Sequence, residues 1–362
     1  MKLMQAKIPE TATRKEKILF ALRAIVFAVL LAALLSYTLY VLVPKYDYGI
    51  CSITNLYQQE DDTVDVLVLG TSLAYGGVNT NVLWEEYGIA AYNLCGAEQP
   101  YWISYYYLQE ALKTQHPQVI VLDAKPATYP DDYSRRGRAF LGTTGIKDPI
   151  IRLRALLSSV APENYASFVA GFPQLHSYYP DVTLDNFAYP PNNGGRGFDW
   201  QGYIESTETE VHSKPSLVWS STKKNVNPRQ VEYFRKTVEL AQRENIPVMV
   251  IGIPNPDYAN DHMYYNTLWE VADEYGVPHV NYNDPTNRYG LLYSSCFSDW
   301  QHLNVKGSVI FSRKLGADLK EMFPLPDRRL DEGYDAWRNG SEAWYETYPE
   351  YLPEKPEEGA PA

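Results

Sequence analysis

The sequence contains little cysteine and fewer basic than acidic residues. Three cysteines in 362 residues, with no Cys-x-x-Cys pair and no Cys/His cluster, exclude a disulfide scaffold and argue against a metal site. Lys and Arg number 32 against 44 Asp and Glu, so a nucleic-acid partner is not expected. No glycine-rich phosphate loop with basic partners occurs, which gives little weight to a nucleotide site. We expect no cofactor.

Apolar and aromatic residues are abundant. The hydrophobic set makes up 45% of the chain and charged residues 21%, which is enough apolar material for a sizeable core and excludes a wholly disordered chain. The sequence has 31 tyrosines and 8 tryptophans. Aromatic faces suit carbohydrate and other amphipathic ligands, although many of these tyrosines must be half-buried packing.

The charge is distributed unevenly along the chain. Residues 1–45 carry a net charge of +5 and the remainder −17, and residues 24–43 contain no charged residue, Pro or Gly. Twenty helical residues span the roughly 30 Å apolar core of a bilayer. Tyr37 and Tyr40 occupy the place of a small-residue cleavage site, which favours an uncleaved signal anchor over a cleaved signal peptide or a buried core helix. We expect residues 1–23 in the cytoplasm, a transmembrane segment at 24–43 and the rest outside.

Beyond this segment, short apolar runs alternate with stretches of helical periodicity. Five runs are typical of buried strands: 65–69, 91–95, 119–122, 247–253 and 279–282. Helices are predicted at 80–87, 100–115 and 148–160, and from residues 227 and 304 onward. Apolar strands joined by amphipathic helices indicate a parallel sheet covered on both faces. We therefore expect an α/β protein with one three-layer α/β/α domain over residues 55–323.

Two stretches depart from this alternation. Residues 125–226 are rich in Tyr, Pro, Asn and Gly and follow the third predicted strand. We interpret them as an insertion, either a cap over the active site or a peripheral excursion without a role. Residues 324–362 are rich in Pro, Tyr and Glu and are expected to form an extended C-terminal tail, which Trp337 and Trp344 could dock to the domain.

Three polar residues are candidates for nucleophilic catalysis. Ser72 follows the first strand in Gly70-Thr71-Ser72, and Asp299 and His302 stand three apart just before the last helix. Ligands bind parallel sheets at the carboxyl ends of the strands, where all three residues are expected. His302 would take the proton of Ser72 while Asp299 orients the imidazole. The alternative is that Ser72 is only a helix cap and that Asp299 and His302 form a structural pair.

This order of motifs resembles the SGNH/GDSL hydrolase family. Its nucleophile follows the first strand in a Gly-Asp-Ser-like motif and its base comes from a late Asp-x-x-His motif, which Gly70-Thr71-Ser72 and Asp299-Trp300-Gln301-His302 match. The resemblance implies a mostly parallel, flavodoxin-like sheet and an oxyanion hole formed by Ser72, Gly96 and Asn93. The family's asparagine block is absent, because the third strand is followed by Leu122-Asp-Ala-Lys-Pro126. The third donor is then either missing or supplied from elsewhere, with Lys125 and Asn93 as candidates.

The resemblance is closest to membrane-anchored, extracytoplasmic bacterial members related to the D-alanyl transfer protein and the alginate O-acetylation proteins. It implies a plasma-membrane serine esterase or O-acyltransferase that acts on acyl esters of cell-wall or exported polysaccharide, with a membrane-bound O-acyltransferase as a candidate partner. The alternative is a catalytically inactive protein of this fold that binds polysaccharide or scaffolds the acyltransferase, which the absent asparagine block favours. Cys95 and Cys296 adjoin motif loops, but we do not expect them to pair.

Overall fold

A computed structural model describes residues 13–45, 48–130, 136–188, 200–213, 220–256, 260–283 and 289–353. Parts of the predicted cytoplasmic segment, insertion and tail therefore lie outside the described residues. The strands are β1 (Val66–Gly70), β2 (Ala91–Cys95), β3 (Val119–Asp123), β4 (Val248–Gly252) and β5 (His279–Asn281). All five expected strands are found, each within about two residues of its predicted bounds.

The helices of the α/β part are α2 (Tyr48–Leu56), α3 (Ser72–Gly77), α4 (Thr80–Tyr87), α5 (Tyr101–Ala111), α11 (Pro228–Arg243), α12 (His262–Glu274) and α13 (Val305–Met322). Two of them begin at the predicted caps. The side chain of Asn227 accepts a hydrogen bond from Arg229 at the start of α11, and that of Asn304 accepts one from Gly307 at the start of α13.

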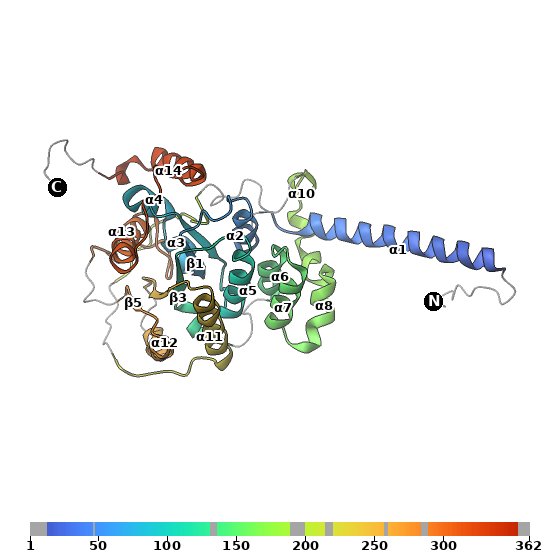
Figure 1. The fold of residues 1–362 in the computed structure, drawn as a ribbon, viewed down its shortest axis with the longest axis horizontal. Coiled ribbons are helices and arrows are strands. Elements are labelled where there is room, and N and C mark those ends of the chain that lie inside the picture. Colours follow the sequence, from blue (N-terminus) through green and yellow to red (C-terminus); the bar gives the residue numbers. More distant parts are fainter. Residues whose placement is uncertain are drawn as a thin grey trace.

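The five strands form one parallel sheet in the order β2-β1-β3-β4-β5. Alternate residues of each strand enter two different cores. Leu67 and Leu69 face the core shared with α5 and α11, whereas Val66 and Val68 face the core shared with α4 and α13. Figure 1 shows these helices on opposite sides of the sheet. The prediction of a three-layer α/β/α protein with a flavodoxin-like strand order is confirmed.

An N-terminal helix, α1 (Arg14–Leu42), projects from this body (Figure 1). It is long and apolar enough to span a membrane by length and composition. Its most apolar 18-residue stretch is not buried at all within the protein. A core helix of a soluble protein would be mostly buried instead.

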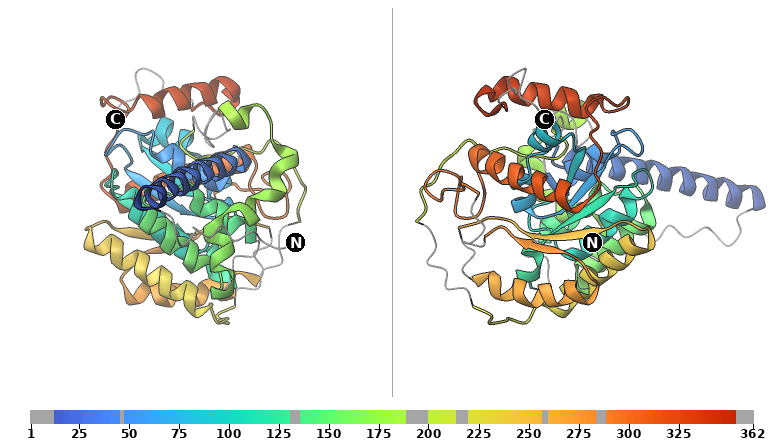
Figure 2. Two further views of the ribbon diagram at one scale, coloured as in Figure 1. Left: turned by 90° about the vertical axis from the view of Figure 1, so that its right-hand side faces the viewer. Right: turned by 60° about the vertical axis from the view of Figure 1, so that its left-hand side comes forward.

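The segment between β3 and α11 is largely helical where it is described. Its elements are η1 (Lys125–Thr128), α6 (Arg136–Thr144), α7 (Pro149–Ser159), η2 (Pro162–Asn164), α8 (Tyr165–Ala170), α9 (Phe172–Leu175), η3 (His176–Asp181) and α10 (Asp185–Ala188). Helix α7 corresponds to the predicted helix, with Asp148 as its N-cap. The others were not expected. Helix α10 lies beside the domain end of α1 (Figure 1), which also contacts α9 and η3, and Figure 2 shows the same body from two further sides.

The C-terminal segment differs from the extended tail that the composition suggested. It forms α14 (Asp335–Thr347) and η5 (Pro349–Tyr351), and α14 packs against α4. Trp337 and Trp344 are both fully buried, and the indole N–H of Trp337 donates to the carbonyl of Ala91 at 3.0 Å. The right-hand view of Figure 2 shows α14 lying along the domain. Trp337 and Trp344 thus dock this segment to the domain, as the sequence suggested they could, but they do so from a helix rather than from an extended chain.

Candidate active site

The candidate nucleophile lies where the strand order reverses. The chain passes from β1 to β2 on one side and then returns to place β3 on the other side of β1. The carboxyl ends of β1 and β3 therefore form the topological switch point, the place where open parallel sheets bind ligands. Ser72, the first residue of α3, follows the end of β1 directly.

Two backbone features fix the turn that carries Ser72. Thr71 caps α3, and its hydroxyl accepts a hydrogen bond from the N–H of Leu73. Gly70 has no room for a side chain, because a Cβ there would lie 2.5 Å from the Cβ of Asp123 on β3. The glycine of Gly70-Thr71-Ser72 is therefore required by the close approach of two strands.

Asp123 ties the ends of β1 and β3 together. Its carboxylate accepts hydrogen bonds from the N–H and the hydroxyl of Thr71, at 3.1 and 2.6 Å, and from the N–H of Lys125 at 2.9 Å. Complete burial raises the pKa of this carboxyl above its ordinary value, and the hydrogen bonds offset part of that rise. Asp123 thus holds the residue that precedes the nucleophile, a role that its position at a strand end could have signalled.

The late Asp-x-x-His segment folds into a tight turn. Phe297 and Leu303 form an antiparallel bridge, and the N–H of Ser298 donates to the carbonyl of His302 at 2.9 Å. Inside the turn, the Asp299 carboxylate accepts the N–H groups of Gln301 and His302 at 2.7 and 2.8 Å. The turn therefore holds the Asp299 carboxylate and the His302 ring side by side.

The structure brings Ser72, His302 and Asp299 into one hydrogen-bonded chain. His302 Nε2 lies 2.8 Å from Ser72 Oγ. His302 Nδ1 lies 2.8 Å from Asp299 Oδ2 and 3.0 Å from Oδ1. A carboxylate only accepts hydrogen bonds, so Nδ1 carries the proton in the neutral ring and Nε2 is left to accept from the serine hydroxyl. This is the arrangement that allows an imidazole to deprotonate a serine.

The local environment keeps Asp299 ionised. Partial burial raises the pKa of its carboxyl, but hydrogen bonds from Gln301 and His302 outweigh this effect and leave the pKa below its ordinary value. The side chains of Asp299 and His302 remain 41% and 29% exposed, so a substrate can reach the array from solvent.

His212 supports the Asp299 turn from outside the array. Its Nε2 lies 2.8 Å from the backbone carbonyl of Asp299, and its ring packs edge-on against Phe297. The N–H of Glu210 also donates to the carbonyl of Phe297. The described residues 200–213, the later part of the predicted insertion, thus run beside the site. His212 lies in a polar stretch without periodicity, so nothing in the sequence pointed to it.

The three predicted oxyanion donors differ in their environment. The N–H of Ser72 makes no hydrogen bond within the described part of the chain and adjoins the nucleophile. The N–H of Gly96 donates to the carbonyl of Gly70 at 3.2 Å. Asn93 is fully buried, and its amide donates to the carbonyl of Val78 at 2.8 Å. Gly96 and Asn93 therefore use these donors within the fold.

Lys125 is also committed to an internal contact. Its Nζ lies 2.6 Å from Asp261 Oδ2, and both side chains are less than a tenth exposed. A buried charge pair of this kind is costly to break, because the remaining charge would be left uncompensated. Lys125 therefore stays with Asp261 and is not available as the third oxyanion donor.

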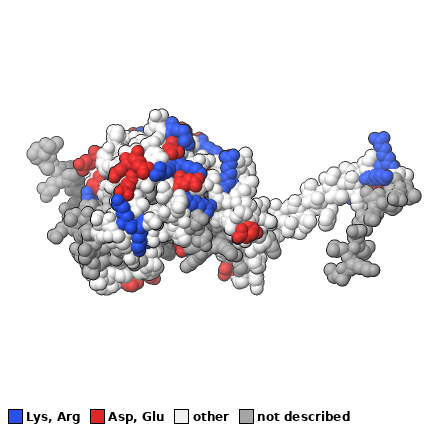
Figure 3. All heavy atoms as spheres, turned by 90° about the horizontal axis from the view of Figure 1, so that it is seen from below, with Lys and Arg blue, Asp and Glu red and all other residues white. Residues whose placement is uncertain are grey.

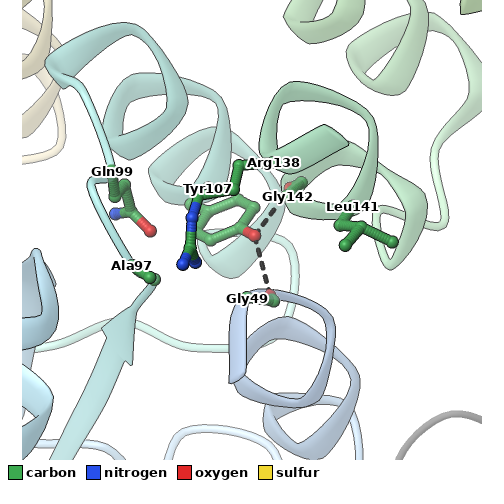
Figure 4. A pocket seen from close by; sticks show the side chains of 8 residues that line it. Gly49, Ala97, Gln99, Tyr107, Arg138, Leu141 and Gly142 are labelled. Carbon is green, nitrogen blue, oxygen red and sulfur yellow. Dashed lines mark hydrogen bonds between the residues drawn. The ribbon is translucent and has the colours of Figure 1, made fainter. Parts of the chain in front are cut away.

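The loop after β2 encloses a small cavity behind Gly96 (Figure 4). The cavity has a volume of about 10 Å³, enough for about one water molecule and too small for a substrate. Tyr107 lines it, with its hydroxyl 2.6 Å from the carbonyl of Gly142 and 3.0 Å from that of Gly49. The cavity belongs to the packing of this loop on α2 and α6.

The described residues offer little for a metal or a disulfide. Among them, no three His, Cys, Asp or Glu side chains come together as metal ligands. Cys95 and Cys296 are buried thiols that do not form a disulfide.

The chain has little similarity to known proteins. No protein-family profile matches the chain, and no curated protein matches it. Among solved structures, the chain is similar to a Bacteroides fragilis protein provisionally named an acylhydrolase, with a TM-score of 0.35 and 12% identity over 75% of this chain and 94% of that one. At this level the similarity carries no functional argument.

Proposed function

We propose that this chain is a serine esterase or O-acyltransferase of the SGNH type. The observation that carries the proposal is the hydrogen-bonded chain from Asp299 through His302 to Ser72 at the switch point of the sheet. Serine and histidine come from segments 230 residues apart, and their atoms meet at 2.8 Å. A helix cap and an unrelated structural pair would not require this alignment.

The first half-reaction transfers an acyl group to the protein. Ser72 Oγ attacks the carbonyl carbon of an acyl ester while His302 Nε2 takes the hydroxyl proton. Asp299 stabilises the imidazolium that forms, and the N–H of Ser72 is placed to donate to the developing oxyanion. The intermediate collapses as His302 returns the proton to the leaving alcohol oxygen, and the acyl group remains on Ser72.

The second half-reaction releases the acyl group. His302 deprotonates either water, which gives a free acid, or a sugar hydroxyl, which gives a new ester; Ser72 recovers its proton in both cases. Trp300 stands between the residues of the Asp-x-x-His motif and is 58% exposed, so it offers an aromatic face on which a sugar ring can stack. This supports acyl esters of cell-wall or exported polysaccharide as the substrate class.

The same proposal includes a membrane topology. Figure 3 shows α1 without charge along most of its length and with basic residues at its far end. The first turn of α1 contains Arg14, Lys15 and Lys17 with one acidic residue, Glu16, and Arg23 lies further along the helix, directly before the uncharged run. A basic flank before the span favours a cytoplasmic N-terminus, which leaves the domain outside the plasma membrane, within reach of polysaccharide and of a membrane-bound O-acyltransferase.

A fluorophosphonate probe tests the proposed chemistry. The detergent-solubilised full chain should be labelled at Ser72, and Ser72→Ala should abolish the label. Ser308→Ala is the control and should keep the label, because Ser308 is buried, with its hydroxyl 2.8 Å from that of Tyr203. Labelling of Ser72→Ala to the same extent as the native chain would refute the assignment of the nucleophile.

A second function is favoured by one observation. The amides of Gly96 and Asn93 and the ammonium of Lys125 are all engaged within the fold, so of these four candidate donors among the described residues only the Ser72 N–H can donate to an oxyanion. A catalytically inactive protein that binds polysaccharide or scaffolds an acyltransferase would tolerate this. Absence of labelling in a folded chain that still binds polysaccharide would support this alternative.

A further inference from the structure

The helical part of the insertion surrounds the point where α1 meets the domain. Helix α1 contacts α9, η3 and α10. The side-chain amide of Asn186 on α10 donates to the carbonyls of Val41 and Val43, at 2.8 and 3.4 Å. These are carbonyls at the helix end that would otherwise lack a partner. The insertion is therefore fastened to the last turn of α1.

This contact sets the level of the insertion along α1. The uncharged run 24–43 has the length of the roughly 30 Å apolar core of a bilayer. Asn186 binds the last residues of that run, and Leu39 lies against Gly171, which precedes α9. When α1 spans a bilayer, η3 and α10 consequently lie at the boundary between hydrocarbon and headgroups.

Large apolar side chains are exposed on these same elements. Tyr179 of η3 is 72% exposed, Leu184 in the following turn 86% and Phe187 of α10 52%. Burying such groups is favourable in proportion to the apolar area that is removed from water, so large apolar side chains left exposed on neighbouring elements call for a covering partner. All three lie on or between elements that contact the apolar helix α1, which indicates a surface that is covered when α1 spans a membrane.

The composition of the segment identifies the covering partner. Residues 165–188 contain six aromatic residues and no Lys or Arg. Tyrosine and other amphipathic side chains are favoured at membrane–water interfaces, whereas recognition of anionic lipids needs basic clusters. The charges within the segment are acidic, at Asp181 and Asp185, and a single basic residue, Lys45, lines the hollow beside α1 together with Asp181. The partner is therefore the uncharged interfacial layer of the bilayer, continuous with the span.

We propose that Tyr179, Leu184 and Phe187 form a docking surface that inserts into the outer leaflet around α1. The proposal rests on the membrane span included in the proposed function, but not on the chemistry of Ser72. Docking would hold the domain at a fixed height and orientation on the membrane. A hollow of about 350 Å³ opens beside α1. It is lined by Leu42, Pro44 and Tyr178 and by the polar residues Lys45, Asp181 and Asn186, so lipid headgroups rather than acyl chains would fill it.

Depth-dependent quenching tests the docking surface on the full chain. Phe187→Cys and Leu184→Cys would each be labelled with an environment-sensitive fluorophore and reconstituted in phosphatidylcholine vesicles, with and without spin-labelled phosphatidylcholine. Leu352→Cys is the matched control, because it is 49% exposed and follows α14 near the C-terminal end, opposite α1 (Figure 1). The native cysteines are buried, and the native chain sets the labelling background.

We expect the labels at 184 and 187 to lose most of their fluorescence to the spin-labelled lipid, and the label at 352 to lose little. Added salt should not change the result, because no basic cluster is involved. Extraction of the protein by alkaline carbonate would overturn both the span and the docking surface. Retention in the membrane with bright labels at 184 and 187 would overturn the docking surface alone.

Discussion

Replacing Asp299 by Asn probes the site with the smallest possible change in shape. In the native turn, Asp299 Oδ1 accepts the N–H groups of Gln301 and His302, whereas Oδ2 faces the ring Nδ1 at 2.8 Å. In the Asp299→Asn chain, the side-chain oxygen must stay on the two backbone donors, since the NH₂ group cannot accept them. The NH₂ group therefore replaces Oδ2 and points at His302.

The expected loss follows from this orientation. The NH₂ group takes the closer position and donates to Nδ1, whereas the retained oxygen, 3.0 Å from Nδ1, already accepts two backbone N–H groups. The neutral ring therefore favours a proton on Nε2, and in that form Nε2 cannot accept from Ser72 Oγ. In serine proteases the equivalent change lowers kcat by roughly 10⁴-fold, and about 1.4 kcal/mol corresponds to each factor of ten. We expect a loss of about 10³- to 10⁴-fold in the rate at which Ser72 is acylated, or ~4–6 kcal/mol.

The assay is the second-order rate constant of fluorophosphonate labelling, measured beside hydrolysis of an activated acyl ester. Because both backbone hydrogen bonds of the turn persist, the melting temperature of Asp299→Asn should stay near that of the native chain. Asp299→Ala is the comparison, since it removes the acceptor of those bonds as well and should lower the melting temperature. An Asp299→Asn chain that labels within tenfold of the native rate would refute the assigned role of Asp299.

Two further predictions concern the same turn. His212→Phe keeps an aromatic ring against Phe297 but loses the hydrogen bond to the Asp299 carbonyl. We therefore expect fluorophosphonate labelling of Ser72 to be about fivefold slower, which corresponds to ~1 kcal/mol. A native labelling rate would show that His212 does not support the Asp299 turn. The lowered pKa of Asp299 means that its stabilising contribution is present above about pH 4 and is lost as pH falls through the folded-state pKa. Thermal melts should show a difference between native and Asp299→Ala chains at about pH 5 that shrinks in more acidic buffer, and a difference that grows there would contradict this sign.

Most of the sheet could be predicted because its strands are buried on both faces. Runs such as 119–122 are apolar at every position, and the caps at Asn227 and Asn304 mark helix starts through local chemistry. The C-terminal helix could not be predicted in the same way. Helix α14 is held by contacts distant in sequence, such as Trp337 on the carbonyl of Ala91, which local composition does not encode.

The candidate site shows the same division. Ser72, Asp299 and His302 stand at strand and helix ends, where spacing alone placed them at one edge of the sheet. The N–H of Gly96 and the amide of Asn93 were expected to complete the oxyanion hole, but both donate to backbone carbonyls instead. The hydrogen bond from Gly96 to Gly70 follows from the register of β1 and β2. His212 acts through a backbone carbonyl of another segment. Such contacts have no sequence signature.

The sequence left open whether the stretch between β3 and α11 is a cap over the site or a peripheral excursion, and its described residues divide between two locations. Its helical part fastens to the end of α1 through Asn186, and its extended part braces the Asp299 turn through His212. One insertion therefore contacts both the predicted membrane span and the candidate catalytic turn. Loss of the Asn186 hydrogen bond should weaken the attachment of the domain to α1, the proposed membrane span, without lowering the acylation rate of Ser72. Loss of the His212 hydrogen bond should lower the acylation rate of Ser72 without weakening that attachment, because each hydrogen bond acts on its own segment.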